Sequence, residues 1–209
     1  MKKITPDTIE EKMFASLKDS ELPKSVIREE IKKGSSVLFT GPLNSGKSTA
    51  QMVFLRHIPN EKEIFIEDNQ FYLAEHLMDV YPEKRISKER KEKTSVSIFD
   101  EITIKTFPEI LISKYKHKNQ VIASFAAKND LEAINRIKEI SDDIFSFEGF
   151  NPEEKMEKVF DIIVVSKIDA NGFRYIEKIN KALSSNNDVL LKDIVVYDYE
   201  KSQYSYSLQ

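Results

Sequence analysis

Short apolar runs alternate with longer amphipathic segments through the first two thirds of the chain. The short runs are rich in valine, isoleucine and phenylalanine, as buried strands are, whereas the longer segments repeat their apolar positions with helical spacing. We expect strands at residues 37–40, 63–67, 96–99 and 121–126, and helices at residues 23–33, 49–58, 70–80, 108–116 and 131–140. Asn129 or Asp130 is placed to cap the last helix. This alternation predicts an α/β fold with a mostly parallel central sheet and crossover helices.

The pattern changes after residue 152. Two apolar runs, residues 160–167 and 173–179, are separated by the sequence DANG, and Asn-Gly between such runs predicts a hairpin. Residues 189–199 would add a further strand, so we expect C-terminal antiparallel strands. Residues 1–22 are interpreted as an N-terminal extension, residues 23–199 as one domain, and residues 200–209 as a polar tail that frays.

Composition fits one domain and excludes several classes of protein. The chain has 209 residues, of which 40% are hydrophobic and 32% charged, and no apolar run approaches the ~20 residues of a membrane span. Because cysteine is absent, there is no disulfide framework or thiolate metal site. The net charge of −3 gives no direct nucleic-acid signal. We expect a cytoplasmic protein, with any association at the inner face of the cell membrane being peripheral.

Two further groups of charged residues carry less information. Residues 84–93 contain a basic cluster that two glutamates interrupt, and such runs are usually solvated faces. The basic residues are Lys84, Arg85, Lys88, Arg90, Lys91 and Lys93. His57, His76 and His117 lack the spacing of metal ligands, so we expect surface or boundary positions for them.

Residues 41–49, GPLNSGKST, match the Walker A phosphate-binding pattern G-x-x-x-x-G-K-[ST]. The strand before the loop and the helix after it are the context that this motif requires, because backbone N–H groups and the helix N-terminus then surround a phosphate. Lys47 would contact the β- and γ-phosphates and Ser48 would bind Mg²⁺. The predicted nucleotide-binding residues are Gly41, Asn44, Ser45, Gly46, Lys47, Ser48 and Thr49.

Two of the expected strands end in a pair of acids. Asp100 and Glu101 follow the run VSIF, and Glu67 and Asp68 end the run IFIED. Ligands bind at the carboxyl ends of strands in open α/β sheets, and phosphoryl transfer needs a held Mg²⁺ and a carboxylate beside the attacking water. Asp100 is therefore a candidate Mg²⁺ ligand, and Glu101 and Glu67 are candidate catalytic residues. The alternative is that acids end these strands at the solvent boundary.

The order of these segments resembles the ATPase domain of the secretion, conjugation and pilus-assembly ATPases of type II and type IV systems. The similar segments are residues 26–38, 58–68, 97–103, 121–127, 160–165, 169–174 and 191–198. Residues 58–68 are similar to the acidic box of that family, whose glutamate activates water, which favours Glu67. The resemblance implies a RecA-like P-loop NTPase core that binds ATP and Mg²⁺ and couples hydrolysis to transport or assembly.

The chain also departs from the pattern of that family. Asp100 and Thr103 stand where its Walker B segment has glycine and arginine, and Ala126 stands at the position of its His-box histidine. Arg85 and Arg90 are the candidate substitutes for its other arginines. Loss of positive groups near the γ-phosphate slows phosphoryl transfer, so a nucleotide-binding, hydrolysis-deficient regulatory subunit is the alternative. The resemblance implies a hexameric homo-oligomer or a partner ATPase subunit, and membrane-embedded secretion components as partners.

A GTPase is the third reading of the sequence. Residues 166–169, SKID, resemble the guanine-specifying motif [NT]-K-x-D, but no D-x-x-G lies between the phosphate loop and that point. Asp169 is better explained as part of the hairpin turn.

Overall fold

A single nine-stranded sheet organises the described part of the computed structural model. The structure describes residues 21–67, 81–89, 94–148, 159–172, 174–185, 188–198, 200–201 and 203–207. The strands are β1 (Val37–Gly41), β2 (Glu63–Glu67), β3 (Arg85–Ser87), β4 (Thr94–Phe99), β5 (Gln120–Ala126), β6 (Ile162–Ile168), β7 (Arg174–Ser185), β8 (Asp188–Asp198) and β9 (Gln203–Tyr206). Their order across the sheet is β3-β2-β4-β5-β1-β6-β7-β8-β9.

The sheet has a parallel part and an antiparallel part. Strands β3, β2, β4, β5, β1 and β6 run parallel to one another. From β6 to β9, each strand is antiparallel to the next. The predicted class, an α/β fold with a mostly parallel sheet and C-terminal antiparallel strands, is therefore confirmed.

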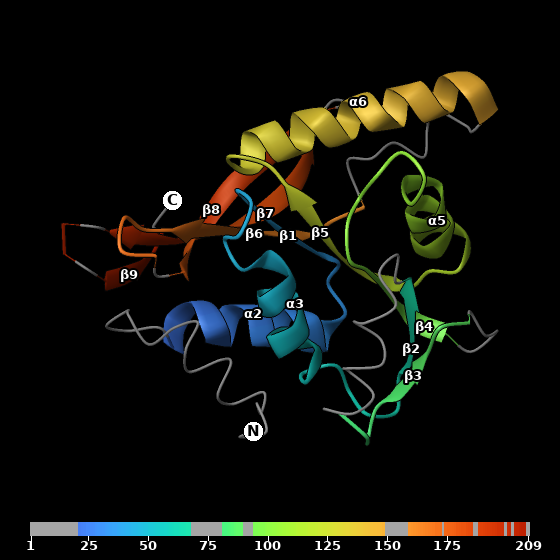
Figure 1. Ribbon diagram of the computed structural model, residues 1–209, viewed down its shortest axis with the longest axis horizontal. Helices are drawn as coiled ribbons and strands as arrows, with labels where there is room; N and C mark the ends of the chain where they lie inside the picture. The colour runs from blue at the N-terminus through green and yellow to red at the C-terminus, as the bar shows by residue number, and fades with distance from the viewer. Residues whose placement is uncertain are drawn as a thin grey trace.

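Helices cover both faces of the sheet (Figure 1). They are α2 (Glu21–Lys33) and α3 (Lys47–Leu55) on one face, and α5 (Phe107–Leu111), the π-helical turn η1 (Ile112–Lys116) and α6 (Asp130–Glu148) on the other. Successive residues of β1 serve both layers: Val37 and Phe39 pack with α2 and α3, whereas Leu38 packs with α5 and α6. A strand buried on both faces reads as a continuous apolar run, which is why the sequence revealed it.

Several elements differ from the sequence-based expectation. Strands β3 and β9 were not expected; β9 lies inside the segment that was predicted to fray, where it pairs with β8. Helix α6 continues to Glu148, well past residue 140, and residues 108–116 divide between α5 and η1. The expected helix at 70–80, His76, and most of the N-terminal extension lie outside the described residues.

The start of α6 confirms one predicted cap. The side-chain oxygen of Asn129 accepts a hydrogen bond from the Glu132 N–H at 2.8 Å. In return, the Glu132 carboxylate accepts one from the Lys128 N–H at 2.8 Å. The first bond satisfies an N–H group that the helix N-terminus leaves without an intrahelical partner, and the second attaches the residue before the cap to the first turn of the helix.

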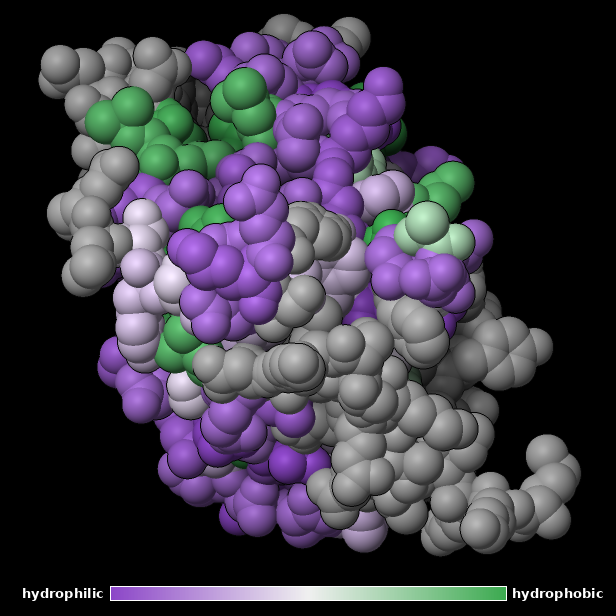
Figure 2. Space-filling model, turned by 90° about the vertical axis from the view of Figure 1, so that its left-hand side faces the viewer, coloured by the Kyte–Doolittle hydropathy of each residue, from purple (hydrophilic) through white to green (hydrophobic). Residues whose placement is uncertain are grey.

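The described part of the basic cluster is only partly a solvated face. Arg85 is exposed on β3 and pairs with Glu63 at 3.4 Å, whereas the ammonium of Lys84 donates to the Ile58 carbonyl and to the Asn60 side chain. Burial lowers the pKa of Lys84. Figure 2 shows one face of the molecule, on which hydrophilic groups dominate and hydrophobic ones form a few small areas. No helix in the described ranges is long and apolar enough to cross a membrane.

Candidate functional site

The loop between β1 and α3 curls because residues in it adopt conformations that favour glycine. The φ angles of Gly41, Asn44 and Gly46 are 147°, 65° and 91°. A Cβ atom at position 41 would lie 2.1 Å from the Ser166 carbonyl oxygen on the neighbouring strand β6, so no side chain fits there. The loop thus joins the carboxyl end of β1 to the N-terminus of α3 in a tight turn.

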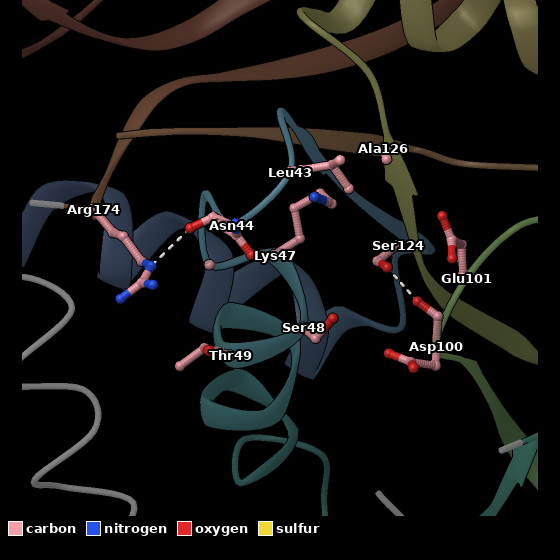
Figure 3. Close-up of a pocket in the computed structure, with 11 residues that line it drawn as sticks. Leu43, Asn44, Lys47, Ser48, Thr49, Asp100, Glu101, Ser124, Ala126 and Arg174 are labelled. Atoms are coloured by element: carbon pink, nitrogen blue, oxygen red, sulfur yellow. Dashed lines mark hydrogen bonds between the residues drawn. The ribbon is translucent and has the colours of Figure 1, made fainter. Parts of the chain in front are cut away.

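A cavity of about 440 Å³ lies against this loop (Figure 3). Its size suits a small-molecule ligand. The lining residues are Leu43, Asn44, Gly46, Lys47, Ser48, Thr49, Asp100, Glu101, Ser124, Ala126 and Arg174. The structure therefore brings together five predicted loop residues and the acid pair that follows β4, although β5 separates β4 from β1 in the sheet.

Lys47 is the cation at the centre of the cavity (Figure 3). Its ammonium donates to the Pro42 carbonyl at 2.9 Å, so the side chain folds back over its own loop. Burial lowers the pKa of Lys47, and the charge of Glu101 opposes that shift. A partly desolvated ammonium whose one hydrogen-bond partner among the described residues is a carbonyl is well placed to gain from an anion.

The acid pair forms the opposite wall. Asp100 is half-buried and Glu101 is exposed. The Ser124 hydroxyl on β5 donates to the Asp100 carbonyl (Figure 3). The Ser124 carbonyl accepts a hydrogen bond from the Ile102 N–H at 2.9 Å. The backbone of the acid pair is therefore fixed to β5, while both carboxylates belong to the cavity wall.

Three predicted site residues are not in the cavity wall. Gly41 lies beneath the loop against Ser166. Ser45 is buried, and its hydroxyl makes no hydrogen bond within the described residues. Glu67 is the last residue of β2 and pairs in register with Phe99, the last residue of β4. It therefore lies at the same, carboxyl end of the parallel strands as Asp100, but one strand farther from β1. The catalytic role of Glu67 stays a prediction, and Asp68 lies outside the described residues.

Arg174, the first residue of β7, is a site residue that the sequence interpretation missed. Its Nε donates to the Asn44 carbonyl at 2.8 Å, and its side chain lines the cavity opposite the acids (Figure 3). A Cβ at Gly46 would lie 2.8 Å from its Cδ, so glycine at 46 leaves room for it. The available signal was its position two residues after the Asn-Gly turn, at the start of the hairpin's second strand, where it pairs with Ile168 at the carboxyl end of the first.

Ala126 and Thr103, which stand where the resembled family has histidine and arginine, add no positive charge to the cavity. Ala126 lines the cavity. The Thr103 hydroxyl accepts from the N–H groups of Lys105 and Thr106, at 3.3 and 3.2 Å, in the turn before α5. The candidate substitute Arg85 lies on the outermost strand, β3, opposite the first residue of β2, and is not part of the lining. Arg90 is outside the described ranges.

The GTPase-like segment serves the hairpin. The Asp169 carboxylate accepts from the Asn171 N–H at 2.8 Å, and the Asp169 carbonyl accepts from the Gly172 N–H at 3.0 Å. The Lys167 ammonium donates to the Lys128 carbonyl at 2.7 Å and pairs with Glu177 at 3.8 Å. These contacts favour the turn interpretation over base recognition.

The donor set fits Mg²⁺ held together with phosphates. The Ser48 hydroxyl and the Asp100 carboxylate line one cavity, facing each other in Figure 3, and both are hard oxygen ligands. Across the described ranges, no group of three or more histidine, aspartate or glutamate side chains could hold a metal ion alone. Mg²⁺ in nucleotide sites commonly uses one or two protein ligands, with phosphates and waters completing the shell.

The chain has an α/β fold with a phosphate-loop sequence between β1 and α3, and this fold is similar to that of solved RecA-like ATPases. Its solved structural neighbours are ATPases of type IV secretion and pilus systems, so the resemblance is confirmed at the level of the fold.

Three solved structures represent this similarity. The VirB11 ATPase of the Brucella suis type IV secretion system, in complex with sulphate, has 16% identity and a TM-score of 0.56, covering 86% of this chain and 57% of VirB11. The pilus retraction motor PilT with bound ADP has 19% identity and a TM-score of 0.52, covering 77% and 52%. The Legionella pneumophila ATPase DotB has 15% identity and a TM-score of 0.52, covering 89% and 52%.

This chain thus spans little more than half the length of those proteins. No protein-family model and no curated protein matches its sequence.

Proposed function

We propose that this chain is a Mg-ATP-binding motor ATPase domain of a bacterial secretion, conjugation or pilus-assembly machine, and that it couples ATP hydrolysis to transport or assembly. The observation that carries the proposal is the cavity that joins Lys47 and Ser48 of the loop to Asp100 and Glu101 of another strand. The RecA-like fold, shared with secretion and pilus ATPases, supports the same function.

Each residue of the cavity has a role in this proposal. Lys47 leaves the Pro42 carbonyl and binds the β- and γ-phosphates, while loop N–H groups surround the phosphate chain. Ser48 and Asp100 hold Mg²⁺, which neutralises charge that develops on the phosphates. Glu101, the exposed acid, orients the attacking water and accepts its proton, with Glu67 as a second carboxylate.

ATP binding by the Lys47→Ala variant tests nucleotide recognition. We expect the affinity for ATP to fall by at least about tenfold, because a charge-assisted contact is worth roughly 1.5–3 kcal/mol. Calorimetry with ATP and with GTP measures the affinity and the base preference together. Wild-type affinity in the Lys47→Ala protein, or a strong preference for GTP, contradicts the proposal.

A hydrolysis-deficient regulatory subunit is the second candidate function. It is favoured by Ala126 and Thr103, which supply no positive charge where the resembled family has histidine and arginine. Phosphate release from ATP separates the two candidates. Release by the wild type that the Glu101→Gln variant lacks supports the motor, whereas tight ATP binding without release, at all protein concentrations, supports the regulatory subunit.

A further inference from the structure

The backbone carbonyls of three successive residues at the end of β4 are each bound by a side chain from a different element. Gln51 of α3 binds Phe99 (3.0 Å), Ser124 of β5 binds Asp100, and Thr106 before α5 binds Glu101 (2.9 Å). The last two contacts attach the acid pair to β5 and to the turn before α5. The Gln51 contact is different, because α3 is the helix that begins with Lys47 and Ser48.

Gln51 is a polar side chain in an apolar setting. It is only 1% exposed, and the residues buried with it on α3 include Ala50, Val53 and Phe54. Its Nε2 also donates to the Ile122 carbonyl at 3.3 Å. Its Oε1, in contrast, is buried without a hydrogen-bond partner among the described residues. An unpaired buried acceptor costs free energy that a methionine of similar size would avoid.

We propose, building on the function above, that Gln51 is a positioning residue that couples the phosphate loop to the acid pair. Gln51 follows Lys47 by four residues, so both side chains lie on one face of α3. A shift of the loop when phosphates bind is therefore carried by the rigid first turn of α3 to Gln51, and by its amide to the Phe99 carbonyl. Asp100 and Glu101 directly follow Phe99, so their position relative to the loop and the metal depends on this contact as well as on those of Ser124 and Thr106.

Gln120 provides a matched control within the same sheet. It is 8% exposed, and its Nε2 likewise donates to two carbonyls, those of Ile31 at 3.1 Å and Ser35 at 2.8 Å. It begins β5, whereas the cavity residue Ala126 ends that strand, so the two sites are about 20 Å apart. Gln120→Met thus removes the same kind of contact far from the acid pair.

The experiment measures how strongly Mg²⁺ strengthens ATP binding. Calorimetry gives the ratio of ATP affinities with Mg²⁺ and with EDTA for the wild type, Gln51→Met, Gln120→Met and Asp100→Asn. We expect Gln51→Met to lower this ratio by about tenfold, since loss of an outer-shell partner typically costs 10–100-fold in metal affinity. The affinity for ADP in EDTA should stay within about twofold, because ADP lacks the γ-phosphate that the acid pair faces. Gln120→Met should leave the ratio unchanged.

Several results would overturn the inference. One is an unchanged Mg²⁺ ratio in Gln51→Met; another is an equal loss of ADP affinity and of the ratio, which indicates general damage. A wild type that binds ATP without any Mg²⁺ effect also rejects it, whereas a wild type that binds no ATP rejects the proposed function instead. If Gln51→Met does not fold, Gln51→Asn withdraws the amide from Phe99 by one methylene and should give the same loss of the ratio.

Discussion

Two glycines illustrate how single residues fix the phosphate loop. Gly41 is in contact with the Ser166 carbonyl, where no Cβ fits, and Gly46 adopts a positive φ while Arg174 lies above it. Two hydrogen bonds to loop carbonyls add to this: the Lys47 ammonium donates to the Pro42 carbonyl, and the Arg174 side chain donates to the Asn44 carbonyl. The motif residues that the sequence predicts to bind phosphate therefore also determine the conformation of the loop.

Replacement of Gly41 by alanine should destabilise the protein far more than the same change at Gly34. Both positions have positive φ, which costs alanine about 1–2 kcal/mol, but a Cβ at Gly34 would meet no atom within 4 Å, whereas one at Gly41 would meet Ser166 at 2.1 Å. Overpacking adds roughly 1–3 kcal/mol. Thermal unfolding should place the midpoint of Gly41→Ala several degrees below that of Gly34→Ala; equal midpoints would show that the loop yields freely.

His57 should make stability depend on mildly acidic pH. Burial, and then the nearby cations, lower its pKa to about 4, whereas in the unfolded chain histidine titrates near about 6.5. Because the unfolded state binds the proton first, the stability from neutral His57 is complete above about pH 6.5 and is lost as the pH falls towards 4.

The His57→Gln variant tests this dependence. Its free energy of unfolding should fall less than that of the wild type between pH 7 and pH 4.5, because glutamine does not titrate. Urea denaturation at both pH values measures the difference. His117→Gln, at an exposed position, controls for loss of a histidine; parallel pH profiles of the wild type and His57→Gln would contradict the prediction.

At the scale of elements, the sequence patterns revealed the strands and helices that are rich in apolar residues and therefore buried. Strand β1 is buried throughout and was predicted almost to the residue. Strand β3 has three residues inside a basic cluster, and β9 alternates tyrosine with polar residues, so both exist through pairing with longer strands. Pairing between distant segments leaves little local signal. The same reason hid Arg174, which meets Asn44 from far along the chain.

Strand β9 should contribute to stability through one of its two tyrosines. Tyr204 is 5% exposed, with its ring centroid 5.0 Å from that of Tyr197, whereas Tyr206 is 55% exposed. Truncation of a buried aromatic side chain costs about 3–5 kcal/mol, and exposed substitutions usually change stability by less than about 0.5 kcal/mol. Thermal unfolding of Tyr204→Ala and Tyr206→Ala should therefore differ by roughly 5–15 °C. Similar midpoints would mean that the tail does fray.

At the scale of the whole molecule, the cavity lies at the carboxyl end of the parallel strands, and its wall comes from segments that are far apart in sequence. The acids lie on one side of Lys47 and the antiparallel hairpin brings Arg174 to the other (Figure 3). The described cavity contains two cations, Lys47 and Arg174. Further positive charge at the γ-phosphate would come from residues outside the described ranges, such as Arg90, or from another subunit.

Assembly should therefore control turnover. If chains complete one another's sites in a ring, phosphate release per chain should rise with protein concentration, together with a mass of several chains in light scattering. ATP should favour the assembled state, since a ligand held between subunits stabilises their association. Constant release per chain at the mass of one chain would contradict a homo-oligomeric motor.

The place of β1 between β5 and β6 also has a consequence for biosynthesis. Residues 37–41 leave the ribosome long before residues 120–126 and 162–168, which flank them in the finished sheet. At translation rates of about 5–20 residues per second, this delay is on the order of ten seconds. During that time an apolar strand is without neighbours, so nascent chains that stall before residue 168 should aggregate or require a chaperone.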